Sequence, residues 1–389
     1  MDAERVPMDG FETYAQVDLG ALERNLDAIR AHVEFRKILL PVKANAYGHG
    51  LTEQSGLGVV SAPLASFLEN RSAVDWFGVA TVEEGVRLRS AGITSPILKL
   101  SATQTHELTR AIEADLTLTV VDPVTIWAAS AAAETMDKHI AVHLKVDTGM
   151  RRIGCPPALA PRFAQLVEEA PYLYLQGVFT HFAASENPEE DDFTTRQLSQ
   201  FMDALDQIES TLGRGIELKH AANSGAVERH PDSWLDMVRP GILAYGYPQS
   251  PVPTLRVDPV LSLISHVSFV KTVHAGETVS YGRTWVALWD TRVATVSIGY
   301  GDGYPRALSN RSEVLIQGRR YPQIGTVCMD QLMVDLGPDS QVGVGEQVTL
   351  IGGDASESIG APELANLAGT ISYEILCGIA DRVARVYIG

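Results

Sequence analysis

Short apolar runs alternate with amphipathic stretches from about residue 17 to about residue 246. Apolar runs rich in β-branched residues predict strands, and apolar residues spaced three and four apart predict helices. Eight strands are expected in this region, at residues 37–42, 76–80, 96–100, 116–121, 140–146, 175–180, 217–219 and 237–243. Eight strand–helix units predict a (β/α)8 TIM-like barrel. A doubly wound open sheet is the alternative, because periodicity does not reveal whether a sheet closes.

Helices are predicted between these strands, for example at residues 82–90, 106–114, 158–169 and 193–212. A further helix at residues 19–32 precedes the first strand, with Asp18 as its N-cap. The segment 51–75 is an exception, because Gly56, Gly58 and Pro63 interrupt the place of the first crossover helix. We expect a broken helix or an inserted loop there.

The pattern changes after about Pro251 to strands separated by tight turns. Strands are expected at residues 261–273, 278–281, 292–298, 313–316, 319–324, 332–335 and 347–351, with one helix at 361–368. The sequence therefore predicts an α/β chain of two domains, a barrel at residues 14–250 and a mostly antiparallel β domain at residues 251–389. Residues 1–13 could pack with the second domain.

Composition excludes several classes of partner. The chain of 389 residues has 48 acidic and 31 basic residues, a net charge of -17 that repels nucleic acids and anionic membrane surfaces. No run of 18 apolar residues suggests a membrane span, and the N-terminus has no readable secretory signal. The three cysteines are too far apart for a disulfide framework or a zinc motif. We therefore expect a cytoplasmic protein without a metal site.

Lys43 is the first candidate for chemistry, because it follows an apolar strand and precedes a Gly-rich turn. Desolvation lowers the pKa of an amine and makes it nucleophilic, as a Schiff-base lysine requires. Other polar residues recur where barrel strands end, namely Lys145, His181 and Asn223. Each alone is more often structural than catalytic. Their recurrence at one rim of a barrel indicates a functional site.

Four groups near this rim suit a phosphate. They are the Ser224 and Tyr47 hydroxyls and the backbone N–H groups of Gly241 and Ile242. The loops after strands seven and eight are the usual phosphate position in such barrels. A Schiff-base lysine together with a phosphate site predicts pyridoxal 5'-phosphate as the cofactor.

The residues PVKANAYGHG at positions 41–50 resemble the cofactor-lysine motif of the alanine racemases, which are barrel-type pyridoxal-phosphate enzymes. The resemblance continues, in collinear order over nearly the whole chain, through residues 143–150, 180–182, 220–224, 238–242, 279–284 and 326–331. It implies racemisation of L-alanine and D-alanine, supplying D-alanine for peptidoglycan.

The resemblance also implies two bases. Lys43 would hold the cofactor and act on one face of a small amino acid, and Tyr281 would reach the opposite face from the partner subunit. A homodimer with shared active sites follows. His181 and Arg152 resemble the residues that favour the phenolate of that tyrosine.

Roles for the remaining residues come from the same resemblance. The cofactor-binding set would be Lys43, Tyr47, His181, Asn223, Ser224, Arg239, Gly241 and Ile242, with Arg239 meeting the pyridine nitrogen. Arg152 and the backbone at Met329 would bind the substrate carboxylate. Lys145 matches a family lysine that can be carbamylated, and Asp330 lines the same loop as Met329.

Asp381 stands where the resembling family segment usually carries a tyrosine that touches the phosphate and narrows the substrate entrance. A carboxylate facing a phosphate is repelled, so Asp381 either points outward or binds a polar substrate side chain. A serine or broad-specificity racemase is therefore an alternative function. A non-catalytic pyridoxal-phosphate-binding protein is a third, which the β domain with Tyr281 argues against.

Overall fold

The computed structural model describes residues 12–34, 36–54, 60–353 and 356–389. It divides into two compact units. The barrel unit comprises Leu22–Ala46 and Gly50–Asp258, and the C-terminal unit comprises Met1–Ala21, Tyr47–His49 and Pro259–Gly389.

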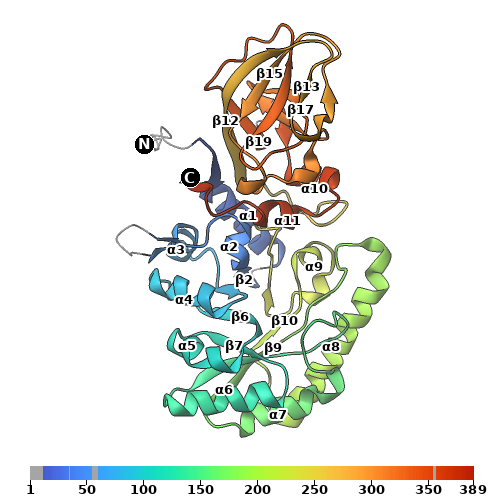
Figure 1. The fold of residues 1–389 in the computed structure, drawn as a ribbon. Helices are drawn as coiled ribbons and strands as arrows, with labels where there is room; N and C mark the ends of the chain where they lie inside the picture. Colours follow the sequence, from blue (N-terminus) through green and yellow to red (C-terminus); the bar gives the residue numbers. More distant parts are fainter. Residues whose placement is uncertain (1–11, 35, 55–59, 354–355) are drawn as a thin grey trace. The chain divides into compact units, whose positions relative to one another are not determined.

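The barrel unit is built on an 8-stranded parallel sheet, which confirms the eight predicted strands (Figure 1). The strands are β2 (Lys37–Pro41), β5 (Trp76–Val79), β6 (Ile97–Ala102), β7 (Thr117–Val120), β8 (Ile140–Lys145), β9 (Leu173–Phe179), β10 (Leu218–His220) and β11 (Met237–Val238). From β2 to β10 each strand pairs in parallel with the next, and β11 pairs in parallel with β2.

The sheet closes between β10 and β11. The Asp236 N–H donates to the Lys219 carbonyl at 3.0 Å, and the Arg239 N–H donates to the Ala222 carbonyl at 2.9 Å. One core cluster also joins buried side chains from five strands, namely Leu39, Trp76, Leu98, Leu218 and Met237. Each such side chain contributes about 2 kcal/mol through burial. The open-sheet alternative is therefore wrong.

Helices cover the outside of the parallel sheet (Figure 1). They are α3 (Pro63–Asn70), α4 (Val82–Ser90), α5 (Leu108–Glu113), α6 (Pro123–Thr135), α7 (Ala160–Glu169) and α8 (Asp191–Leu212), with α1 (Leu19–His32) ahead of β2 and α9 (Ser224–Arg229) after β10. The segment 51–75 is broken as expected, into β3 (Glu53–Gln54), β4 (Val60–Ser61) and α3. Gly56 and Gly58 lie outside the described residues.

Strand eight is shorter than predicted, ending at Val238 rather than at residue 243. Pro240 has no N–H to continue a ladder. Turns follow it, in which Ala244 N–H donates to the Gly241 carbonyl at 3.0 Å. The segment carrying Gly241 and Ile242 is therefore a buried turn beyond the strand end.

The C-terminal unit holds a 9-stranded sheet in the order β20-β19-β16-β17-β18-β15-β12-β1-β21, with a further pairing between β19 and β12 that closes part of it into a barrel. Its strands are β1 (Tyr14–Asp18), β12 (Leu261–Val273), β15 (Thr291–Val296), β16 (Glu313–Ile316), β17 (Arg319–Ile324), β18 (Leu332–Gly337), β19 (Gln347–Gly353), β20 (Ser358–Ile359) and β21 (Ala384–Ile388). A hairpin of β13 (Thr278–Val279) and β14 (Trp285–Val286) and the helices α10 (Ala361–Ala368) and α11 (Ser372–Cys377) complete it.

Pairing in this sheet is antiparallel except between β1 and β21. Strand β1 lies within the residue range 14–250, yet it pairs with β12 and β21. Sheet pairing therefore groups residues 14–18 with the C-terminal unit. A local pattern cannot reveal such a partner more than 200 residues away.

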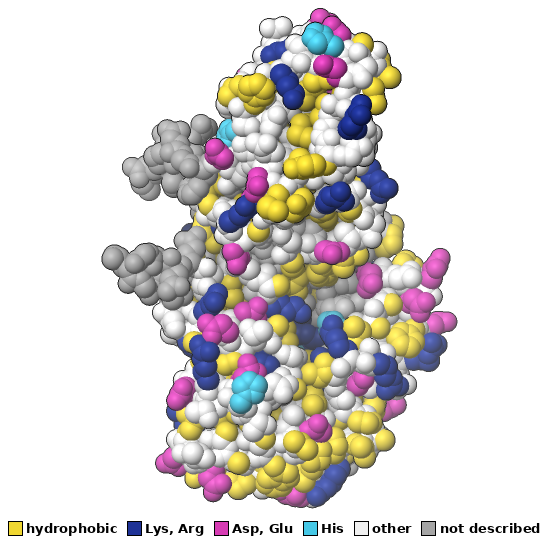
Figure 2. Space-filling view, viewed as in Figure 1, with side chains coloured by type: hydrophobic (Ala, Val, Ile, Leu, Met, Phe, Trp, Pro, Cys, Tyr) yellow, Lys and Arg dark blue, Asp and Glu magenta, His cyan; other side chains and the backbone are white. Residues whose placement is uncertain are grey.

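The surface carries charges of both signs. Figure 2 shows acidic and basic side chains interspersed over the visible face. Interspersed charges do not form the basic stripe that a polyanion requires. None of the helices in the described ranges is long and apolar enough to cross a membrane.

Candidate active site

Lys43 begins a left-handed turn, α2 (Lys43–Tyr47), at the end of β2. Ala44, Asn45, Ala46 and Tyr47 have φ angles of 52°, 55°, 52° and 56°. Each costs an L-residue about 1–2 kcal/mol, and strain of this kind concentrates at functional sites. Hydrogen bonds hold the turn. Ala46 N–H donates to the Val42 carbonyl at 2.9 Å, and Leu51 N–H donates to Asn45 Oδ1 at 2.7 Å.

A cluster of cations surrounds the end of β8, where Lys145 is only 5% exposed. Burial, and then the charges of Arg239, Arg152 and Lys43, lower the pKa of Lys145 to about 7. Burial, and then the charges of Arg239, Lys145, Arg152 and Lys43, also lower the pKa of His181 well below its usual value. Within a chain of net charge -17, this cationic cluster suits an anionic ligand.

Replacing Lys145 by methionine is expected to stabilise the cofactor-free protein in a pH-dependent way. Because folding lowers the pKa of Lys145 from 10.5 to about 7, the charged amine destabilises the native state fully below pH 7. That cost declines as the pH rises from 7 to 10.5. The gain from Lys145→Met should therefore be largest near pH 6 and small near pH 10, measured by urea unfolding in CO₂-free buffer. A gain independent of pH would contradict the shift.

Arg239 is held from several sides although it is only 4% exposed. Its guanidinium donates to the Thr180 carbonyl at 2.8 Å, the Ala221 carbonyl at 2.9 Å, and His220 Nδ1 at 2.9 Å. A fourth contact reaches His181 Nδ1 at 3.3 Å. Burial lowers the pKa of Arg239 to about 9, which leaves it charged at neutral pH.

These contacts determine the tautomers of the neighbouring histidines. An arginine can only donate, so Nδ1 of His220 and of His181 must accept and their Nε2 atoms carry the proton. His220 Nε2–H then donates to His143 Nδ1 at 2.9 Å. Burial lowers the pKa of His143 to about 3 and that of His220 well below its usual value. Sequence reasoning had assigned no role to His143 or His220, because nothing local shows that β8 and β10 bring them together.

Ser224 joins the loops after β10 and β11. Its hydroxyl accepts a hydrogen bond from the Leu243 N–H at 3.3 Å, so the Gly241–Ile242 turn lies beside it. In this structure Asn223 caps α9 by accepting from the Ala226 N–H at 3.1 Å.

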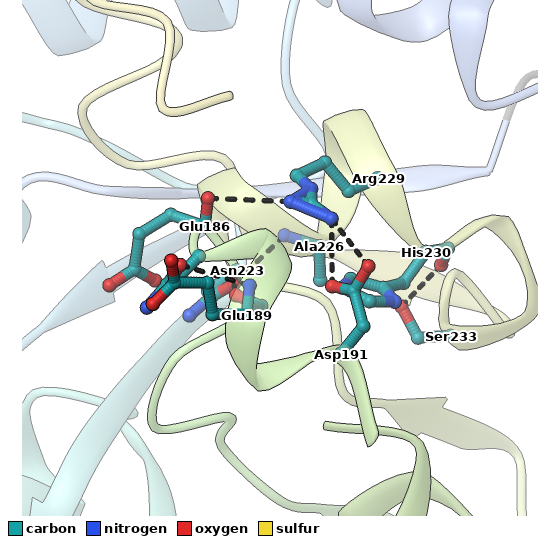
Figure 3. A network of polar contacts seen from close by, with 10 residues as sticks. Glu186, Glu189, Asp191, Asn223, Ala226, Arg229, His230 and Ser233 are labelled. Carbon is teal, nitrogen blue, oxygen red and sulfur yellow. Dashed lines mark hydrogen bonds and ion pairs between the residues drawn. The ribbon is translucent and has the colours of Figure 1, made fainter. Parts of the chain in front are cut away.

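A polar network joins α9 to the start of α8 (Figure 3). The Ser185 hydroxyl donates to Asn223 Oδ1 at 2.6 Å, and Arg229 makes two bonds of 2.7 and 2.6 Å to the Asp191 carboxylate. Both bonds start from Arg229 Nη2, and this ion pair ties α9 to Asp191, the first residue of α8. The Ser224 hydroxyl therefore sits on a rigid element, as a binding group should.

Tyr281, Met329 and Asp330 form a second group, in the C-terminal unit. Tyr281 is 72% exposed and Met329 54% exposed. The Tyr281 carbonyl accepts from Thr326 Oγ1 at 2.8 Å, and Ser280 Oγ donates to the Thr326 carbonyl at 2.5 Å. The loop of Tyr281 is therefore tied to the loop that carries Met329.

Asp330 belongs to an ion-pair network in the same unit. Arg382 donates to Asp330 Oδ1 and to Asp302 Oδ1, each at 2.7 Å. The network connects the loop of Met329 to the segment after α11.

Tyr373, on α11, is a residue that sequence reasoning missed. Its ring centroid lies 5.8 Å from that of Tyr47, which is 7% exposed. A Cβ on Gly48 would lie 2.0 Å from the Leu376 carbonyl oxygen, so α11 packs closely on the segment after Lys43.

Asp381 instead lies exposed in the turn after α11, near Arg385. The tyrosine beside Tyr47 is thus Tyr373, which lies eight residues before position 381. The Ser-Tyr-Glu sequence at residues 372–374 could have indicated it. The alternative of serine or broad specificity rested on Asp381 replacing this tyrosine, and it gains no support here.

Comparisons with known proteins show the family of this chain. The family models "Alanine racemase, N-terminal domain" and "Alanine racemase, C-terminal domain" match residues 17–249 and 260–387. The chain is 45% identical to an alanine racemase of Cutibacterium acnes over 378 residues, which cover 97% of this chain and 98% of that protein.

Solved structures are similar over the same extent. An alanine racemase of Clostridium difficile 630 has a TM-score of 0.88 and 34% identity, covering 97% of this chain and 96% of that one. An alanine racemase of Bartonella henselae with covalently bound pyridoxal phosphate has a TM-score of 0.85 and 25% identity, covering 97% of this chain and 100% of that one.

Proposed function

This chain belongs to the alanine racemase family, and we propose that it interconverts L-alanine and D-alanine with pyridoxal 5'-phosphate held by Lys43. The observation that carries the proposal is the strained Lys43 turn beside the cationic cluster of Lys145, Arg152 and Arg239. The donor set fits the cofactor. Ser224, the Gly241–Ile242 turn and Tyr47 would hold its phosphate.

When bound, the cofactor supplies an electron sink that acidifies the Cα–H of an amino acid. In one direction of the reaction, Lys43 would take the proton from one face of Cα and Tyr281 would deliver a proton to the opposite face, and in the other direction the two roles would be exchanged. Arg239 would donate to the pyridine nitrogen. Because a guanidinium does not surrender its proton at neutral pH, the ring withdraws less charge and side reactions are suppressed.

Arg152 and the Met329 N–H would bind the substrate carboxylate. The near-neutral pKa of Lys145, about 7, favours the free amine that reacts with CO₂. A carbamate there would replace a cation beside Arg152 with an anion and so orient the guanidinium. His181 is neutral, and together with Arg152 it would support the phenolate of Tyr281.

We also propose that the enzyme is a homodimer with shared sites. A proton-transferring tyrosine works best away from bulk water, yet Tyr281 is 72% exposed in the single chain. A second copy would cover it and bring it to the Lys43 of the partner. The three cysteines, Cys155, Cys328 and Cys377, form no disulfide, in keeping with a cytoplasmic enzyme that supplies D-alanine for peptidoglycan.

The function is tested by incubating the purified protein and pyridoxal 5'-phosphate with L-alanine, L-serine or L-leucine and separating the enantiomers by chiral chromatography. We expect alanine to reach an equal mixture of enantiomers from either side, with kcat/KM at least about tenfold above that of serine. Faster racemisation of serine would favour the alternative specificity, and no exchange of any substrate would overturn the proposal.

A further inference from the structure

The Glu84 carboxylate connects the Lys43 turn to the end of the neighbouring strand. Glu84 Oε1 accepts from the Ala44 N–H at 2.8 Å, and Oε2 accepts from the Ala80 N–H at 2.8 Å and the Thr81 N–H at 3.1 Å. We infer that Glu84 is a positioning residue that orients Lys43 for the cofactor. The inference rests on the proposed function.

The position of this bond matters because Ala44 N–H belongs to the first peptide after Lys43. Ala44 is also the first of four consecutive non-glycine residues with left-handed φ. L-residues do not retain such a conformation unless surrounding contacts hold it. An ionised acceptor on an amide N–H makes one of the stronger hydrogen bonds in proteins.

The other end of the carboxylate is anchored to a rigid frame. Ala80 and Thr81 directly follow β5, which pairs with β2. Val42 N–H also donates to the Gly78 carbonyl at 2.8 Å, just ahead of the turn. Glu84 therefore fixes the start of the left-handed turn against the ends of two paired strands.

Glu84 has a structural role as well, and a test must separate the two. With Thr81 it forms the capping box of α4, in which Glu84 N–H donates to Thr81 Oγ1 at 3.2 Å. A carboxylate in the first turn of a helix also stabilises the helix dipole. Glu83 shares that position but pairs with Arg87 at 3.1 Å and with Arg110 at 2.5 Å, so it offers a matched control.

The experiment compares Glu84→Gln with Glu83→Gln and Thr81→Ala in the full chain. The two glutamine variants remove one charge from the same helical turn, and Thr81→Ala removes the cap. An amide at position 84 would present its NH₂ group either to Ala44 N–H or to the Ala80 and Thr81 N–H groups, where an acceptor is required.

Two readouts follow the position of Lys43. Treatment with pyridoxal 5'-phosphate for a series of times, then borohydride and peptide mass spectrometry, gives the rate at which Lys43 is covalently labelled. Steady-state kinetics give kcat and KM. Glu84→Gln should lower kcat about tenfold, with a matching loss in labelling rate and little change in KM. Glu83→Gln and Thr81→Ala should stay within about twofold of the wild type.

Glu84→Asp keeps the negative charge in the first turn of α4 but shortens the side chain by one methylene, which withdraws the carboxylate from the Ala44 N–H. It should retain the melting temperature of the wild type and still lose labelling rate, which excludes simple misfolding. Equal behaviour of the Glu84 and Glu83 variants would overturn the inference. If the wild type itself failed to label at Lys43, the proposed function would fail instead.

Discussion

Replacing Lys43 by alanine is expected to lower racemisation of alanine by about 10⁴-fold or more, because one side chain would both hold the cofactor and act as a base. Borohydride labelling of the chain with pyridoxal 5'-phosphate should be lost at the same time. Chiral assay and peptide mass spectrometry measure the two effects. Both losses should occur while the far-ultraviolet circular dichroism stays that of a folded protein.

Lys37→Ala is the matched control, because Lys37 lies exposed at the other end of the same strand, β2. It should keep activity within about twofold of the wild type, since surface changes away from special features have small effects. Substantial activity of Lys43→Ala, or continued labelling at another lysine, would remove Lys43 from its proposed role.

Mixing two inactive variants is expected to restore activity. Tyr281→Phe removes the second base and should lower activity about 10²- to 10⁴-fold. A dimer that combines one Lys43→Ala chain with one Tyr281→Phe chain would have one doubly defective site and one site with both bases. With random exchange half the dimers are mixed, so about a quarter of the wild-type activity should return.

Tyr174→Phe serves as the control, because it also removes one tyrosine hydroxyl. Tyr174 lies on β9, and its hydroxyl donates to the exposed Glu217 carboxylate at 2.9 Å. It should leave activity near that of the wild type. In the mixing experiment, subunits are exchanged in mild denaturant and assayed after its removal. If the mixture stayed as inactive as its parents while native mass spectrometry showed mixed dimers, each subunit would hold a complete site of its own.

Local patterns were sufficient for most of the barrel. The eight strands and the break at residues 51–75 follow from side-chain periodicity and from the backbone restrictions of Gly and Pro. Strand eight was predicted too long because apolar Ile242 and Leu243 extend the pattern after Pro240. Both residues are apolar because they are buried, at 0% exposure, but they lie in a turn and not in a strand.

Contacts between segments far apart in the chain could not be predicted from local patterns. Strand β1 pairs with β12 and β21, and the ring of Tyr373 meets that of Tyr47. Each contact joins segments more than 200 residues apart. The sequence analysis compared position 381 with the family tyrosine, whereas the structure places Tyr373 beside Tyr47, a contact that could not be seen from the sequence.

The sequence by itself determined the order of the elements, the residue types at the strand ends and the family to which they belong. These follow from the preferences of short segments and from the chemistry of single side chains. Only the tertiary structure decided that the sheet closes, that burial and three neighbouring cations together lower the pKa of Lys145, and that Arg239 sets the histidine tautomers. Such properties depend on distances between residues far apart in the chain. For the same reason the left-handed turn of Lys43 and its anchor at Glu84 became visible only in the folded chain.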